Sequence, residues 1–241
     1  MQTQKGESDG HEQHAVLYEK KHSTPLQGAI NMQLIAHYHN AGFESVADGV
    51  MDFFDRREDL HRPGVAFGPD SNNAEPAKVS TDISLVAHNS GSDPEAFALA
   101  DVIVRAVSAG LEHYLKKRTM FREVCPDQEL FVMPVFNLQR YAPGEGFKQW
   151  HCDWTISDEA TEPVHRVLAW VLYCDSVIEA GTEFLWQEHH EIAERGKLVI
   201  FPASPSHIHR GRVNNELSKT IATGWINAGS REGFLSRLAR A

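Results

Sequence analysis

The sequence is poor in cysteine and contains no Cys-x-x-Cys pair. Its three cysteines, Cys125, Cys152 and Cys174, are an odd number spread over 241 residues, which argues against a disulfide framework. Such sparse cysteine usage is typical of proteins in reducing compartments, so we expect a cytoplasmic protein. Cys152 is expected to be a small packed side chain rather than a nucleophile.

The chain also lacks an excess of positive charge, long apolar runs and internal repeats. It has 23 Lys and Arg residues against 33 Asp and Glu, which gives a formal net charge of −10. Nucleic acids and anionic membranes require a positive field, so we expect neither as a general partner. No run approaches the roughly 20 apolar residues that span a bilayer, and the polar segment 1–15 predicts no signal peptide.

The N-terminal half predicts helices after a flexible polar tail at residues 1–14. Residues from about 24 to 42 have mixed periodicity and are predicted as one helix that ends at Gly42. Ser45 is expected to cap the next helix, residues 45–59. The buried face of that helix is predicted from helical spacing to consist of Val46, Val50, Phe53 and Phe54.

A loop and a strand precede the longest predicted helix. Residues 61–77 are rich in Pro, Gly and Asn and are predicted as a loop, and residues 78–88 are predicted as a strand. Residues from about 95 to 118 carry apolar side chains at steps of three and four, which predicts a helix that packs on a sheet. The apolar stripe consists of Phe97, Ala100, Val104, Val107, Leu111 and Leu115.

After Cys125 the sequence changes to short segments rich in β-branched and aromatic residues, separated by turn residues. Helices followed by a run of strands indicate an α+β protein, a β sandwich or barrel with helices packed on one side. No linker separates the two halves, so we expect a single domain over residues 15–241. The predicted strands are residues 130–141, 165–175, 181–188, 196–202 and 219–226.

The segment 140–153 ends in a His-x-Asp pair, His151 and Asp153. In an extended segment, residues i and i+2 lie on the same face, so an imidazole and a carboxylate can reach one point. A mixed nitrogen and oxygen pair suits a divalent transition metal, and His207 and His209 are candidates for a third ligand. Two histidines and one carboxylate form the facial site of non-haem Fe(II), which leaves positions open for a co-substrate and oxygen.

The last predicted strand carries a cation on a face that is otherwise largely apolar. Lys219, Ile221, Thr223 and Trp225 alternate onto the same side of the strand. A lysine on an amphipathic strand usually faces solvent, but the apolar neighbours Ile221 and Trp225 favour an inward direction. Because an isolated buried charge costs several kcal/mol, an inward Lys219 needs a negative partner such as a substrate carboxylate.

The order and spacing of these segments resemble those of the Fe(II)- and 2-oxoglutarate-dependent oxygenases, most closely the prolyl-4-hydroxylase-like branch. Tyr141 lies ten residues before His151, and Lys219 lies ten residues after His209. The resemblance covers residues from about 130 to 227. In chain order the matching residues are Tyr141, His151, Asp153, Tyr173, Gly181, Gly196 to Pro202, His209, Lys219 and Trp225.

The resemblance implies a double-stranded β-helix, or jelly roll, with supporting N-terminal helices and with Fe(II) near one open end. The implied metal ligands, which are also the catalytic residues, are His151, Asp153 and His209. The spacing to Lys219 in this family favours His209 over His207 as the third ligand.

The resemblance also implies a binding pocket for 2-oxoglutarate. Its C5 carboxylate is expected to meet Lys219 and Tyr141, and Tyr173 and Thr223 are expected to line the same pocket. The implied reaction uses O2 to hydroxylate an unactivated C–H bond of a prolyl peptide or a small molecule, with succinate and CO2 as co-products. Ascorbate is a candidate reductant.

Two motif positions depart from the family pattern. Cys174-Asp175 stands where the family has Leu-Asn, and Ala180-Gly181 stands where it has two glycines; neither position is an implied metal ligand. A nucleic-acid demethylase of the AlkB kind is disfavoured by the negative charge and by Lys219, where that branch has an arginine. The competing class is a non-catalytic β-barrel binding protein, or a cupin-like protein that holds Zn(II) or Ni(II).

Several side chains near these motifs are expected to have ordinary structural roles. Trp150 and Trp154 are predicted to be pocket walls or core residues. Arg166 is expected either to touch substrate or to be solvated at a strand end. His189 and His190 are predicted to lie on the surface.

Overall fold

The computed structural model describes residues 34–64, 66, 77–87, 93–124, 129–154 and 165–238 of the chain. The predicted tail at residues 1–14 and most of the first predicted helix lie outside these residues. None of the described helices is both long enough and apolar enough to cross a membrane.

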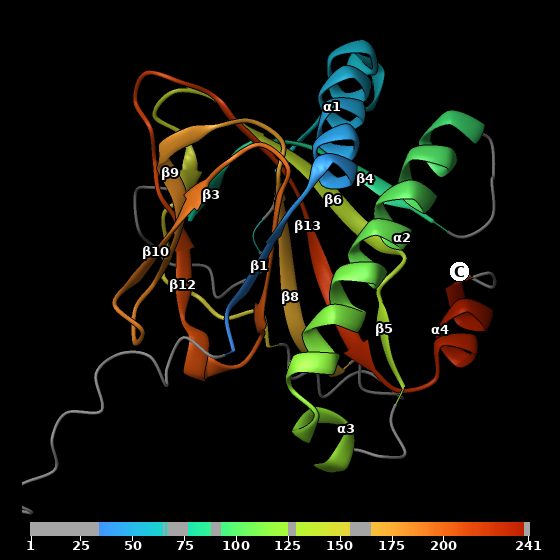
Figure 1. Cartoon of the computed structure of the whole chain (residues 1–241). Coiled ribbons are helices and arrows are strands. Elements are labelled where there is room, and N and C mark those ends of the chain that lie inside the picture. Colours follow the sequence, from blue (N-terminus) through green and yellow to red (C-terminus); the bar gives the residue numbers. More distant parts are fainter. Residues whose placement is uncertain are drawn as a thin grey trace, which may run out of the picture.

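A large antiparallel sheet forms the centre of the fold (Figure 1). Its strands follow the order β1-β11-β8-β13-β6-β4-β2, and β5 pairs with β13 beside this path. In chain order the strands are β1 (Ala36–His39), β2 (Arg62–Pro63), β4 (Thr81–Val86), β5 (Leu130–Val132), β6 (Val135–Tyr141), β8 (His165–Tyr173), β11 (Lys197–Pro202) and β13 (Lys219–Ala228).

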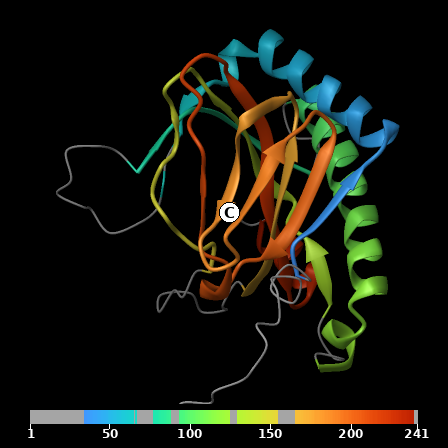
Figure 2. The ribbon, with the colours of Figure 1, turned by 60° about the vertical axis from the view of Figure 1, so that its left-hand side comes forward.

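A smaller three-stranded sheet faces the large one, as the rotated view in Figure 2 shows. It consists of β10 (His189–Ala193), β9 (Val177–Phe184) and β12 (His209–Gly211), and a two-stranded sheet pairs β3 (Lys78–Val79) with β7 (Gly146–Phe147). The predicted α+β fold with a jelly-roll core is confirmed. The sheets stay open at their edges, so this jelly roll is not a closed barrel.

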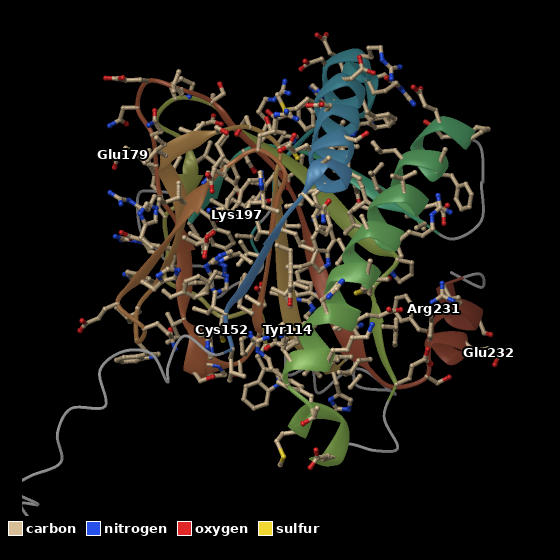
Figure 3. All side chains as sticks on the ribbon, viewed as in Figure 1. Tyr114, Cys152, Glu179, Lys197, Arg231 and Glu232 are labelled. Carbon is tan, nitrogen blue, oxygen red and sulfur yellow. The ribbon has the colours of Figure 1, made fainter. Side chains whose placement is uncertain are left out.

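Two long helices cover the face of the large sheet that points away from the small sheet (Figure 1). These are α1 (Ala41–Arg56) and α2 (Pro94–Lys117). Tyr114, labelled in Figure 3, is buried on α2 and donates a hydrogen bond to the Leu34 carbonyl (3.0 Å), which ties α2 to the segment before β1. The short helices are η1 (Glu58–Leu60), α3 (Met120–Val124), η2 (Pro205–His207) and α4 (Arg231–Leu238).

The large sheet separates two apolar cores because side chains alternate between its faces. Along β8, Leu168, Trp170 and Leu172 belong to the core shared with α1 and α2. Ala169, Val171 and Tyr173 belong to the core between the two sheets. The predicted apolar faces of both long helices lie in the first core, with Val46, Val50, Phe53, Phe54, Ala100, Val107, Leu111 and Leu115 all buried.

The predicted helix over residues 24–42 is wrong in its described part. Residues 36–39 form β1, which pairs with β11 at the edge of the large sheet. Helix α1 begins directly afterwards, and its cap is Asn40, whose Oδ1 accepts a hydrogen bond from the Phe43 N–H (3.0 Å). The predicted cap, Ser45, instead lies exposed within the helix.

Several predicted strands differ in their limits. The predicted strand 78–88 is divided into β3 and β4, and the predicted strand 181–188 is the end of a longer β9. Gly181 therefore lies within a strand, where a Cβ atom would come within 1.6 Å of the Glu191 carbonyl oxygen of β10. His189 and His190 belong to β10 and are half-buried, so their prediction as surface residues is wrong.

Candidate active site

The candidate site lies where the segment after β7 meets the start of β12. His151 and His209 are joined there by two backbone hydrogen bonds. The His151 N–H donates to the His209 carbonyl (3.0 Å), and the His209 N–H donates to the His151 carbonyl (2.8 Å). This pairing holds the two residues side by side although they lie far apart in the sequence.

Asp153 forms a cluster with the two histidines. The ligand atoms of His151, Asp153 and His209 all lie within 4.8 Å of one another, and His209 Nε2 lies 3.4 Å from Asp153 Oδ2. His207, the alternative third ligand, is not part of this cluster. The structure thus brings together the three residues that the sequence nominates as metal ligands, and their ligation of a metal remains a prediction.

Backbone carbonyl groups orient both imidazoles. His151 Nδ1–H donates to the Gln149 carbonyl (2.9 Å), and His209 Nδ1–H donates to the His207 carbonyl (3.0 Å). A histidine whose Nδ1 is held in this way presents Nε2 to a metal. The donor set of two imidazole nitrogens and one carboxylate fits Fe(II) in a facial arrangement with open positions.

Aromatic rings surround the two imidazoles and limit their contact with water. Phe147 stacks on His151, with ring centroids 3.7 Å apart and planes at 11°, and Phe201 meets His209 edge-on at 4.8 Å. Burial, together with the neighbouring His209 imidazole, lowers the pKa of His151 to about 4. His151 is therefore neutral near pH 7, which is the form that binds a metal.

His207 lies in the loop before β12 and is close to the cluster without joining it. Its side chain is buried, and its Nδ1 lies 3.0 Å from Ser206 Oγ. Burial, with a smaller contribution from His209, lowers its pKa to about 4. His207 is thus a neutral, buried imidazole beside the site.

Lys219 is buried on the inner face of β13, the direction that its apolar neighbours favour. The residue is 4% exposed, and its Nζ donates to the carbonyls of Ala180 (2.5 Å) and Arg212 (3.3 Å). Burial lowers the pKa of Lys219 to about 8. Within the described residues it forms no ion pair with a carboxylate, so its positive charge remains available to an anionic ligand.

Two buried tyrosines lie on strands next to Lys219. Tyr141 is directly opposite Lys219 in the register of β6 and β13, and its hydroxyl donates to Gln139 Oε1 (2.6 Å). The Tyr173 hydroxyl lies 2.7 Å from Thr182 Oγ1. Burial raises the pKa of both tyrosines, so they are neutral hydrogen-bonding groups.

Thr223, the remaining predicted 2-oxoglutarate contact, is half-buried in β13, and its Oγ1 donates to the Trp170 carbonyl (2.8 Å). Sequence reasoning missed Gln139 and Thr182, the partners of the two tyrosines. Gln139 precedes Tyr141 by two residues and therefore shares its face, and this spacing is a signal that the sequence contains.

The surroundings of Arg166 and Trp154 decide between alternatives that the sequence left open. Arg166 is half-buried, with Cζ 3.4 Å from the Trp225 ring centroid and Nη1 3.5 Å from the Asp153 carbonyl oxygen, so it is not a solvated strand-end residue. Trp150 is half-buried, whereas Trp154 is 50% exposed and is not a core residue.

Comparisons with known proteins agree with this geometry. Residues 136–227 match the family model of the 2OG-Fe(II) oxygenase superfamily, whereas no curated protein matches the chain. The structure is similar to the viral collagen prolyl hydroxylase vCPH from Paramecium Bursaria Chlorella virus-1, solved as a 2OG complex. That pair is 17% identical with a TM-score of 0.53, over 81% of this chain and 97% of that chain.

Two further prolyl hydroxylases have similar folds. A Pseudomonas putida prolyl-4-hydroxylase is 14% identical with a TM-score of 0.56, over 84% of this chain and 99% of that chain. A Trichoplax adhaerens prolyl hydroxylase, solved with a hypoxia inducible factor oxygen degradation domain peptide, is 12% identical with a TM-score of 0.54, over 82% and 85% of the two chains.

The match to the 2OG-Fe(II) oxygenase model spans residues 136–227, which is less than half of the chain. The fold of the described residues is similar to the folds of these prolyl hydroxylases.

Proposed function

We propose that the chain is an Fe(II)- and 2-oxoglutarate-dependent dioxygenase that hydroxylates an unactivated C–H bond of a prolyl peptide or a small molecule. The convergence of His151, Asp153 and His209 carries this proposal, because their donor set is that of non-haem Fe(II) oxygenases. The match of residues 136–227 to the superfamily model supports the reaction class. Similarity to prolyl hydroxylase folds supports a prolyl substrate.

In this proposal the three clustered residues hold Fe(II), and Lys219 binds the C5 carboxylate of 2-oxoglutarate. When bound, the metal and its co-substrate supply the O2 chemistry that yields succinate, CO2 and a hydroxylated product, with ascorbate as a candidate reductant. Lys219 supplies the counter-charge, and Tyr141, Tyr173 and Thr223 line the pocket that receives the dicarboxylate. The buried Phe201 ring and the half-buried Phe147 ring limit the contact of the imidazoles with water.

Succinate formation tests the proposal directly. The full chain is incubated with Fe(II), 2-oxoglutarate and ascorbate, and candidate peptides and small molecules are screened for a product that has gained one oxygen atom. His151→Ala and Asp153→Ala are expected to abolish turnover while circular dichroism remains that of the wild type. His113→Ala, an exposed histidine of α2, is the matched control and is expected to keep full turnover.

Two outcomes would contradict the proposal. Wild-type turnover in both ligand variants would remove the site. Tight binding of Zn(II) or Ni(II) with neither 2-oxoglutarate binding nor succinate formation would favour the alternative, a cupin-like binding protein.

A further inference from the structure

A buried ion pair lies next to the candidate site without taking part in it. Lys78 Nζ lies 2.6 Å from Asp82 Oδ2, and the two side chains are 2% and 12% exposed. Ser80 Oγ donates to the other carboxylate oxygen, Asp82 Oδ1 (2.7 Å). Burying two charges carries a large desolvation cost, so such a pair is weak evidence for stability and calls for another explanation.

The lysine end of this pair is attached to the segment that carries two of the predicted metal ligands. Lys78 lies in β3, and its register partner in β7 is Phe147, whose ring stacks on the His151 imidazole. The Ala77 carbonyl also accepts a hydrogen bond from the Lys148 N–H (2.9 Å). Residues 77–79 are therefore attached to residues 146–149, which directly precede the ligand pair.

The aspartate end is attached to the large sheet beside the predicted 2-oxoglutarate pocket. Asp82 lies in β4, directly opposite Gln139 of β6, and side chains at directly opposed positions lie on the same face of a sheet. Gln139 in turn accepts the hydrogen bond from the Tyr141 hydroxyl. The pair thus connects the metal-ligand segment to the strands that hold Tyr141.

We infer that the Lys78–Asp82 pair is a positioning device that fixes the segment carrying His151 and Asp153 relative to Tyr141. The inference rests on the proposed function, since it assigns a task to residues outside the reacting groups. β3 and β7 form a sheet of two short strands, and the directional bonds of Lys78, Ser80 and Asp82 anchor it to β4. Apolar contacts of the same size would fill the space without fixing this register.

Metal binding by the full chain tests the inference, with Mn(II) affinity measured by calorimetry and Co(II) absorption reporting the ligand geometry. Lys78→Met is expected to weaken Mn(II) binding about tenfold, the lower end of the range for residues that orient metal ligands. The double variant Lys78→Met/Asp82→Leu removes both buried charges. It is expected to melt close to the wild type and still to show weaker Mn(II) binding and a changed Co(II) spectrum.

Leu111→Ala is the matched control, because it destabilises the remote core between α2 and the large sheet. It is expected to lower the melting temperature and to leave Mn(II) affinity unchanged. Ser80→Ala removes one hydrogen bond without exposing a charge, and it replaces Lys78→Met if that variant does not fold; a smaller loss of affinity is expected.

The inference is overturned if the double variant binds Mn(II) with wild-type affinity and the same Co(II) spectrum. It is also overturned if Ser80→Ala, used where Lys78→Met does not fold, gives this result. It is equally overturned if Leu111→Ala weakens binding as much as Lys78→Met. If the wild-type chain binds neither Mn(II) nor 2-oxoglutarate, the proposed function itself is refuted. If the wild type binds both and the variants bind equally well, only the positioning role of the Lys78–Asp82 pair is refuted.

Discussion

Lys219, which is 4% exposed and forms no ion pair with a carboxylate among the described residues, is the most informative single residue in this chain. Among the described carboxylates, only the more distant Asp175 favours its charged form. Burial alone disfavours the ammonium form, and the two carbonyl groups near Lys219 Nζ offset only part of that cost. A dicarboxylate that places one carboxylate beside Nζ restores the missing charge interaction. In the proposed function, the dicarboxylate co-substrate is this anion.

Replacing Lys219 tests this role. Lys219→Ala is expected to raise the dissociation constant for 2-oxoglutarate about 10- to 100-fold, because a charge-assisted hydrogen bond is lost in a dry pocket. Calorimetry with the Mn(II)-loaded protein measures the change. An unchanged constant would mean that the C5 carboxylate is bound elsewhere.

The lowered pKa of Lys219 also predicts a pH dependence. Its folded-state pKa of about 8 means that the cation is lost as the pH rises through 8, so 2-oxoglutarate affinity falls on the alkaline side. If only the cation binds, the dissociation constant rises about tenfold between about pH 7 and pH 9. The Lys219→Arg variant keeps its positive charge between about pH 7 and pH 9. If its 2-oxoglutarate affinity falls as much as that of the wild type over this range, another group causes the pH dependence.

Single substitutions also test whether His207 or His209 is the third metal ligand. His209→Ala is expected to abolish Mn(II) binding, because it removes one of three clustered ligand atoms. His207→Ala is expected to keep binding, since the His207 group that holds His209 is a backbone carbonyl, which alanine retains. The reverse result would show that the cluster in this structure is not the metal site.

At the scale of elements, local patterns predicted the structure well wherever a segment is long and periodic. The stripe of residues 95–118 predicted α2 within one residue at each end, and the apolar strands after Cys125 correspond to the strands of the two sheets. Strands β1 and β10 were not predicted, because their extended conformation depends on the strands with which they pair and not on a pattern in their own sequences. β1 pairs with β11, which lies about 160 residues later in the chain.

The start of α1 provides a test of where this helix begins, at Asn40 as in the structure or at Ser45 as the sequence pattern predicts. Asn40→Ala is expected to lower stability by about 1 kcal/mol through loss of the cap, which corresponds to about 2–4 °C in melting temperature for a chain of this size. Ser45→Ala is expected to leave stability unchanged or slightly improved, because alanine is the better residue inside a helix. A larger loss for Ser45→Ala would place the helix start where the sequence pattern put it.

At the scale of the whole molecule, the large sheet assigns its two faces to different tasks. One face packs on α1 and α2 in an apolar core, and the other carries Lys219, Tyr141 and Tyr173 toward the small sheet. From the resemblance to a known family we predicted that His151, Asp153 and His209 lie together, and they do. This was possible because the order and spacing of the motifs are visible in the sequence. The pairing of Lys78 with Phe147 and of Asp82 with Gln139 depends on strand register, which the sequence alone does not contain.

Occupation of the site is expected to stabilise the entire fold. Mn(II) and 2-oxoglutarate, each present at about 100 times its dissociation constant, add about 2.7 kcal/mol each, which together corresponds to a rise of about 10–20 °C in melting temperature. Differential scanning fluorimetry with Mn(II) and 2-oxoglutarate measures this rise. His209→Ala should show no rise, and an equal rise in that variant would indicate binding at another place.

The reciprocal backbone hydrogen bonds between His151 and His209 have a consequence for metal exchange. Because these bonds form when the chain folds, the ordering entropy of the two ligand segments is lost before any ion arrives. Loading and unloading then require little rearrangement of the main chain. Protein isolated with a foreign divalent ion should therefore be converted to the Fe(II) form by chelation and dialysis, without passing through an unfolded state.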